Sequence, residues 1–107
     1  MITETKDLRE FTDLQQTILE AEYFLATARV KGCGVFKMLH TSGKQGLLLR
    51  RALRRHKTEG KILFLVKGEE FSRQMKETQD LIDRYPFVED DEDLDKQNPE
   101  ITVVCVR

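Results

Sequence analysis

The spacing of apolar residues along the 107-residue chain predicts alternating strands and helices. Three short apolar runs, residues 35–39, 62–66 and 101–106, predict strands, because a buried strand needs only about four to eight hydrophobic residues. The mostly polar residues 2–8 are a weaker strand candidate. Between them, apolar residues recur every three or four positions, as on the buried face of a helix. The helical segments cover about 12–32, 47–58 and 72–85.

The order strand, helix, strand, helix, strand, helix, strand predicts an α/β fold in a single domain, residues 1–107. We expect a two-layer α/β sandwich with a mixed sheet of about four strands. The run 62–66 is apolar throughout, which is typical of a strand at the centre of a sheet, whereas the polar run 2–8 suits an edge. Residues 71–99 are expected to form an insertion, a helix followed by a mobile acidic loop at 89–95.

Charge is segregated along the chain although the formal net charge is only −1. Residues 37–61 contain eight Lys or Arg and one acid, whereas residues 69–100 contain twelve acids and four bases. A local basic surface attracts polyanions whatever the net charge, so this composition allows nucleic-acid binding. The acidic third would face elsewhere, compete for the basic surface, or bind a protein partner.

The sequence shows no membrane or secretion signal and no cysteine pattern that indicates a chemical function. No apolar run approaches the roughly 20 residues that span a bilayer, and the N-terminus does not resemble a signal peptide, so we expect a cytoplasmic protein. The two cysteines, Cys33 and Cys105, have neither disulfide nor metal-ligand spacing and are expected to be buried.

The segment "HTSGKQG" (40–46) joins a predicted strand to the basic helix. Free amides and the positive dipole end at a helix N-terminus favour a phosphate. The candidate binding residues of this loop are Thr41, Ser42, Gly43, Lys44 and Gly46. The loop lacks the full Walker spacing, and its bare G-x-x-G follows a strand, whereas the KH loop joins two helices. The alternative is a strand-to-helix turn that needs glycine only for its shape.

Four arginines within six residues follow the loop, with no acid from 50 to 58. These are Arg50, Arg51, Arg54 and Arg55. Their mutual repulsion favours an anionic partner, although a solvated helix face is the alternative. His40, at the end of the preceding strand, is either a structural residue or a member of a site beside the loop.

The order of these segments resembles that of the small MutS-related (Smr) domain. In that family a strand ends in Leu-Asp-x-His/Arg-Gly, and a helix and a strand with a His-Gly-x-Gly loop follow; a basic helix and closing strands complete the pattern. The corresponding segments here are "KDLREFT", "FLATARVKG", "VFKMLHTSGKQGLLLRRAL" and "ITVVCVR". Lys6, Glu10 and Thr41 stand where the family has leucine, glycine and glycine, so the resemblance is to a divergent member.

The resemblance implies binding of branched or otherwise structured DNA or RNA, and several family members nick DNA or cleave RNA. It implies that Asp7, Arg9 and His40 are catalytic. In those roles Asp7 would hold a divalent metal or orient a base, Arg9 would neutralise a phosphate, and His40 would transfer a proton. The alternative for Asp7 and Arg9 is that they simply pair with each other.

The leading hypothesis is therefore a nucleic-acid-binding Smr-like domain for which endonuclease activity is open. A divalent metal would be expected as a cofactor only if the protein is a nuclease, and the sequence predicts no resident metal site. The alternative is a protein-interaction module that lacks nucleic-acid binding, in which the acidic run 89–95 covers the basic helix. A third option is an enzyme that binds a small phosphate compound at the strand–loop–helix site.

Overall fold

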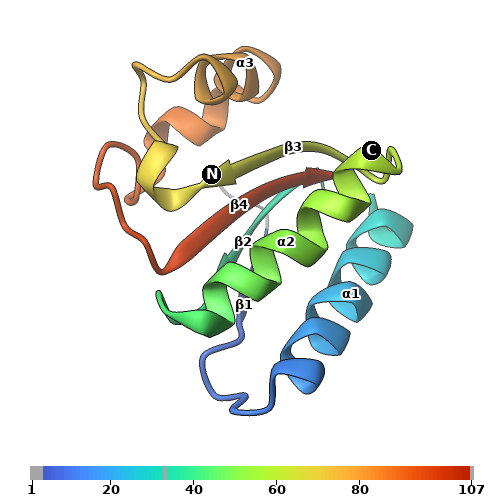
Figure 1. Cartoon of the computed structure of the whole chain (residues 1–107). Helices are drawn as coiled ribbons and strands as arrows, with labels where there is room; N and C mark the ends of the chain where they lie inside the picture. The colour runs from blue at the N-terminus through green and yellow to red at the C-terminus, as the bar shows by residue number, and fades with distance from the viewer. Residues whose placement is uncertain (1–3, 33, 107) are drawn as a thin grey trace.

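The computed structural model describes residues 4–32 and 34–106, which form a mixed four-stranded sheet flanked by helices (Figure 1). The strands are β1 (Glu4–Asp7), β2 (Val35–Leu39), β3 (Ile62–Lys67) and β4 (Ile101–Val106). The α-helices are α1 (Leu14–Lys31), α2 (Lys44–Thr58) and α3 (Lys76–Arg84), and two 3-10 turns are η1 (Gly68–Glu70) and η2 (Pro86–Asp90). Ile2, where the first strand was expected to begin, and Cys33 lie outside the described residues.

The strand order β1-β2-β4-β3 confirms the predicted α/β class and the mixed sheet. Strands β1 and β2 are parallel, whereas β4 is antiparallel to both of its neighbours. The expectation that 62–66 lies at the sheet centre is wrong, because β4 inserts between β2 and β3 and leaves β3 at an edge. All six residues of β4 are buried, whereas only Ile62 and Val66 are fully buried in β3.

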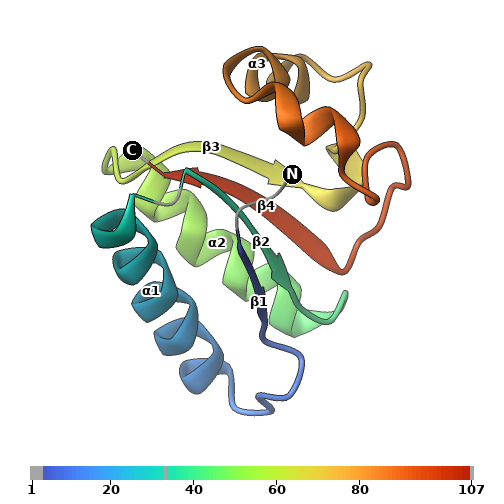
Figure 2. The same ribbon diagram turned by 180° about the vertical axis from the view of Figure 1, so that it is seen from behind.

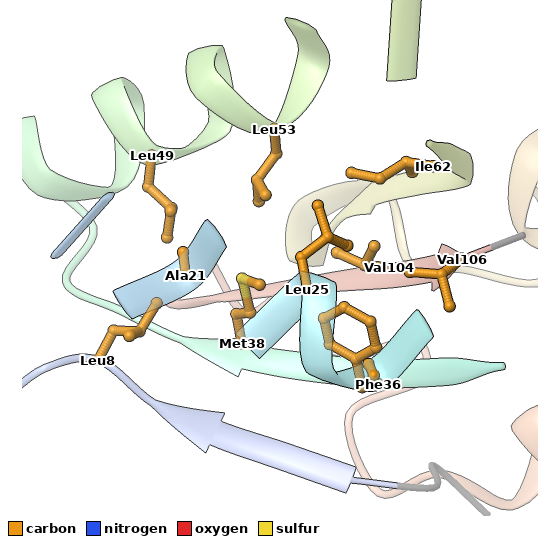
Figure 3. Close-up of a cluster of buried hydrophobic side chains, with 11 residues drawn as sticks. Leu8, Ala21, Leu25, Phe36, Met38, Leu49, Leu53, Ile62, Val104 and Val106 are labelled. Atoms are coloured by element: carbon orange, nitrogen blue, oxygen red, sulfur yellow. The ribbon is translucent and has the colours of Figure 1, made fainter. Parts of the chain in front are cut away.

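Helices α1 and α2 cover one face of the sheet and enclose the first hydrophobic core. Asp13 caps α1 by accepting a hydrogen bond from the Gln15 amide at 2.9 Å, and Gly32 ends the helix in the left-handed conformation with φ 75°. Figure 3 shows Leu25, Leu49 and Leu53 directed from the two helices toward the sheet. This packing fixes α2 across the sheet.

The chain between β3 and β4 covers the opposite face, as the view from behind shows (Figure 2). Phe71, Leu81, Val88 and Leu94 enclose a second core here. Helix α3 begins at Lys76, after an exposed Met75, which is later than the start near residue 72 that the sequence predicted. Thr78 and Leu81 are its buried residues, and Ile82 and Tyr85 pack against the same core.

The sequence predicted that the acidic run, residues 89–95, is a mobile loop. The structure contradicts this prediction. Asp91 and Asp93 both accept hydrogen bonds from the buried ammonium group of Lys37 in β2, and Leu94 enters the second core. A buried cation and an apolar anchor therefore order a segment that its composition alone would leave unpacked. Cys105 is buried in the same core, as expected.

None of the described helices is long and apolar enough to span a membrane.

Candidate nucleic-acid interface

Most of the residues that the sequence singled out lie along one edge of the sheet, where β1, β2 and β3 end and β4 begins. Asp7 is the last residue of β1 and pairs in register with Leu39, which directly precedes His40. Thr102 at the start of β4 is in register with Met38 on one side and with Lys67 at the end of β3 on the other. Because α2 also begins here, at Lys44, the edge combines strand ends with a helix N-terminus.

Asp7 and Arg9 form an exposed bidentate pair. The Asp7 carboxylate accepts hydrogen bonds from the Arg9 backbone amide at 2.9 Å, from Nε at 3.0 Å and from Nη2 at 2.8 Å. These hydrogen bonds lower the pKa of Asp7 to about 2, so the carboxylate is ionised at neutral pH. The pairing that the sequence left open is thus present, and the catalytic roles of both residues stay predictions.

His40 is fully buried, with both ring nitrogens hydrogen-bonded inside the protein. Nδ1 lies 2.9 Å from the Thr41 carbonyl oxygen, and Nε2 lies 2.8 Å from the Thr102 hydroxyl. The Thr41 carbonyl oxygen can only accept, so Nδ1 carries the proton of the neutral ring, and Nε2 then accepts from the Thr102 hydroxyl, which itself accepts from Arg50 Nε at 2.9 Å. This network holds His40 as the neutral tautomer with its proton on Nδ1.

Burial lowers the pKa of His40, which agrees with a neutral ring. Neither ring nitrogen is free to reach a substrate in this arrangement. A proton-transfer role for His40 stays a prediction, whereas its hydrogen bonds to Thr41 and Thr102 give it a clear structural role.

Arg50 differs from the other arginines of α2 because its guanidinium group is largely buried. It donates to the Glu69 carboxylate from Nη1 at 3.1 Å and from Nη2 at 2.8 Å, and to the Ile101 carbonyl at 2.8 Å. Its side chain is only 14% exposed, and its hydrogen bonds lower the pKa of Glu69. This geometry favours a structural role that ties α2 to β4 and η1.

The residues around the start of α2 pack more closely than the sequence predicted. The loop expected at 43–46 ends at Gly43, because Lys44, Gln45 and Gly46 already belong to the helix. A Cβ atom on Gly46 would lie 2.4 Å from the Thr41 carbonyl oxygen and 2.8 Å from His40 Nδ1. Gly46 therefore lets the helix approach the His40 segment closely.

Gln45 joins the two loops that precede α1 and α2. Its Oε1 accepts from the Thr41 amide at 2.8 Å, and its Nε2 donates to the Phe11 carbonyl at 2.8 Å and to the Leu8 carbonyl at 3.2 Å. Gln45, Thr102 and Glu69 were not among the candidate residues predicted from the sequence. Their partners lie up to 62 positions away, so no local pattern reveals them.

The remaining loop candidates, Thr41, Ser42, Gly43 and Lys44, are exposed at this edge. Gly43 precedes α2 and provides no side-chain cap for its first amides. The first turn of α2 also contains no acidic residue. These features leave the positive end of the helix dipole uncompensated by its own side chains.

Arg51, Arg54 and Arg55 are exposed, and we call them the basic face of α2. None of the three forms an ion pair with any residue that the structure describes. Beside them, a groove of about 540 Å³ separates α2 from the end of β3. It is lined by Ser42, Leu47, Arg50, Arg51, Arg54, Lys67 and Glu69.

A second groove of about 290 Å³ shares Arg50, Arg54 and Lys67 with the first. The two grooves therefore lie next to each other along α2, and we call them together the channel. Its far end is partly neutralised, because Lys57 Nζ lies 2.6 Å from Glu77 Oε1. Lys67, the last residue of β3, adds a cation to the channel, although the sequence did not predict it as a binding residue.

The acidic run does not cover the basic face, contrary to one hypothesis from the sequence. Asp91 and Asp93 bind Lys37 in the sheet, and Asp95 pairs with Arg73. Among the described residues, the acids that pair with side chains of α2 are instead Glu22, Glu59, Glu69 and Glu77. A protein partner for the exposed part of residues 89–95 stays a prediction.

Within residues 4–32 and 34–106, no group of three or more His, Cys, Asp or Glu side chains could hold a metal ion. A divalent metal at Asp7 would have to displace or share the hydrogen bonds from Arg9.

The whole chain is similar to a solved structure, the crystal structure of the Smr domain of Thermus thermophilus MutS2. The TM-score is 0.57 at 19% sequence identity, and the match covers 97% of this chain and 98% of that chain. The protein therefore has an Smr-like fold, as the sequence resemblance implied. No family model matches the sequence. No curated protein matches it.

Proposed function

We propose that this protein binds the phosphate backbone of nucleic acid along the basic face of α2 and the adjoining channel. The observation that carries the proposal is that Arg51, Arg54 and Arg55 are exposed without an acidic partner among the described residues. Three unpaired guanidinium groups within five residues repel one another, and a polyanion removes that repulsion.

The surroundings of the arginines support a backbone rather than an isolated phosphate. The two grooves of the channel adjoin each other beside α2, since they share Arg54 and Lys67. Lys44 extends the positive surface to the N-terminus of the same helix, where the Ser42 hydroxyl is also exposed. Contacts of this kind are electrostatic and independent of sequence, so they suit recognition by shape and charge.

Binding of branched or structured DNA or RNA is the finer form of the proposal, and it comes from the Smr resemblance. The Smr-like fold supports it, and the basic helix follows β2 and the loop in the order that the resemblance gives. A backbone that follows α2 to its N-terminus reaches the edge that carries Asp7 and Arg9.

A binding assay with two matched variants tests the proposal. Fluorescence anisotropy would follow single-stranded, duplex and branched DNA and RNA of equal length at low salt. Arg51→Ala/Arg54→Ala/Arg55→Ala should weaken binding by about tenfold or more, because each lost phosphate contact reduces affinity. Lys76→Ala/Arg84→Ala/Lys96→Ala removes the same charge from exposed positions in the chain between β3 and β4, and should bind like the wild type.

Two results would contradict the proposal. Failure of the wild type to bind any of these nucleic acids at low salt would remove it. An equal loss in both triple variants would show that net charge matters and the basic face does not. All six positions are exposed, so neither variant is expected to unfold.

Nuclease activity would centre on the Asp7–Arg9 pair. An ionised carboxylate can hold a metal ion or orient a water molecule, and the neighbouring guanidinium group can neutralise a phosphate. Asp7→Asn should abolish cleavage of a labelled branched substrate in the presence of Mg²⁺ while nucleic-acid binding persists. Glu10→Gln, an exposed acid in the same turn, is the control and should cleave normally. Unchanged cleavage by Asp7→Asn would exclude this role.

A further inference from the structure

Helix α1 carries an exposed apolar stripe on the side opposite the core. Leu19, Tyr23 and Val30 are 61%, 73% and 88% exposed, and Ala26 lies exposed between them. Their spacing of four, three and four residues places them in one line along the helix. Figures 1 and 2 show α1 at the rim of the molecule with no other element outside it.

This stripe is unusual for the molecule. Among the described residues, the other large hydrophobic side chains that are exposed are Leu47 and Met75, which lie apart on α2 and before α3. Single exposed apolar residues are ordinary, whereas an aligned set indicates a contact surface. A repeat of this kind, from Leu19 to Val30 in a helix of 18 residues, is the pattern with which one helix packs along another.

The charges beside the stripe indicate which helix would fit. At 100° per residue, Glu20 and Lys31 flank one side of the stripe, and Glu22 and Arg29 flank the other. Both acids lie in the N-terminal half of this region and both bases in the C-terminal half. We propose that α1 packs antiparallel against α1 of a second copy of this chain.

An antiparallel pair related by a twofold axis brings the same flank of both helices together in opposite directions. Leu19 would face Val30 of the second copy, and Tyr23 would face its Ala26. In the same register, Glu20 lies near Lys31 of the second copy, and Glu22 lies near its Arg29. Every flanking acid therefore meets a base, and the two helix dipoles also oppose each other favourably.

A parallel pair would be disfavoured by the same charges. It would place the opposite flanks together at the same height, so Glu20 would face Glu22 and Lys31 would face Arg29 across the interface. Arg29 has no ion pair with any described residue, and Lys31 has only a 3.8 Å contact with Glu4. Both bases are thus available to a second copy.

The pairing has a geometric consequence that rests on the proposed function. Helix α2 lies beside the Glu22 flank of α1, because His56 Nε2 lies 2.7 Å from Glu22 Oε2. The twofold axis keeps equivalent flanks on one side, so both basic faces would border the same side of the dimer. A dimer would then present two backbone-binding surfaces to one structured nucleic acid.

Sedimentation velocity without nucleic acid tests the pairing separately from nucleic-acid binding. A single helix face is smaller than a standard interface, so the wild type should dimerise within roughly 1 µM to 1 mM. Val30→Asp should raise the dissociation constant by about tenfold or more, because it buries a charge in the stripe. Leu47→Asp places the same charge on α2, at the similarly exposed Leu47, and should leave dimerisation unchanged.

Charge reversal tests the antiparallel register. Glu20→Lys and Lys31→Glu should each weaken the dimer, and the double variant should recover wild-type association because each pair is restored in the opposite sense. A wild type that stays monomeric over this range would overturn the proposal and leave the stripe to a different partner. Equal dimerisation by Val30→Asp, or no recovery in the double variant, would also overturn it.

Discussion

The Thr102 hydroxyl receives a hydrogen bond from Arg50 and gives one to His40, so the protonation of His40 is coupled to the position of α2. A protonated His40 would donate from Nε2, so the Thr102 hydroxyl would have to turn its own proton away and accept from both His40 and Arg50. Burial of the ring adds the cost of placing a charge inside the protein. The neutral ring is therefore the form that the folded protein requires.

The pH dependence of stability should report this requirement. Because the folded state lowers the pKa of His40 below its ordinary value of 6.5, the unfolded chain binds the proton more readily. The free energy of unfolding should thus be constant above about pH 6.5 and decrease below it, by at most about 1.4 kcal/mol per pH unit. Urea unfolding between about pH 7 and 5 measures this decrease, at pH values above the range in which carboxylates lose their stabilising charge.

The chain has two histidines, which provide a matched comparison. His40→Gln should lose the decrease between about pH 7 and 5, whereas His56→Gln should keep it. The same pH dependence in His40→Gln and in the wild type would show that His40 is not the group responsible.

Gly46 provides a second test at the level of a single residue. Alanine would favour the helix by up to about 1 kcal/mol. That gain should be outweighed, because the new Cβ would lie 2.4 Å from the Thr41 backbone oxygen, which is hydrogen-bonded to the buried His40. Gly46→Ala should lower the free energy of unfolding by about 1–3 kcal/mol. Lys44→Ala, exposed in the same turn, should change it by less than about 0.5 kcal/mol, and an equally small effect of Gly46→Ala would contradict the packing described.

The segment between β3 and β4 depends on one buried cation. Lys37 is 5% exposed in β2 and is paired with both Asp91 and Asp93. Burial alone would lower the pKa of Lys37, but the hydrogen bonds to the two carboxylates outweigh it and raise the pKa overall. These ion pairs hold the acidic run against the face of the sheet that α2 does not cover.

Lys37→Met should therefore destabilise the protein by about 3–5 kcal/mol, because it leaves carboxylates without their buried partner. Lys37→Met/Asp91→Asn/Asp93→Asn removes all three charges and should recover much of that loss. Chemical denaturation measures both variants. A single variant as stable as the wild type would show that the pairing contributes little to this segment.

Elements with local signals were predictable from the sequence, and those without such signals were not. Helix α1 begins after Asp13 and ends at Gly32 as expected, because a cap and a left-handed glycine act within a few residues. The position of β3 could not be predicted, because the long connection that places β4 beside β2 has no local pattern. The acidic run was misjudged because its partner, Lys37, lies 54 positions away.

The candidate site likewise contains residues that the sequence predicted and residues whose roles depend on distant partners. The exposed Arg51, Arg54 and Arg55, and the Asp7–Arg9 pair, follow from residues close in sequence. The different environment of Arg50 depends on Glu69 and Thr102, which meet it only in the folded chain. Helical spacing placed Arg50 with the other arginines, since it gives the direction of a side chain without the neighbours that it meets.

The basic face of α2 and the acidic run lie on opposite sides of the sheet. The basic face of α2 lies on the side of the sheet covered by α1 and α2, whereas Asp91 and Asp93 lie on the opposite side with Lys37. A protein of formal net charge −1 can thus present a local positive surface. In the Smr-like fold, that surface leads to the sheet edge that carries Asp7, Arg9 and the start of α2.

The salt dependence of binding tests most directly whether the basic face contacts phosphates. The slope of log affinity against log salt for duplex DNA changes by about 0.9 for each phosphate contact. Arg51→Ala/Arg54→Ala/Arg55→Ala should therefore flatten the wild-type slope by about 2.7, and Lys76→Ala/Arg84→Ala/Lys96→Ala should leave it unchanged. An unchanged slope in the α2 variant, or the same flattening in both, would contradict the assignment of backbone binding to this helix.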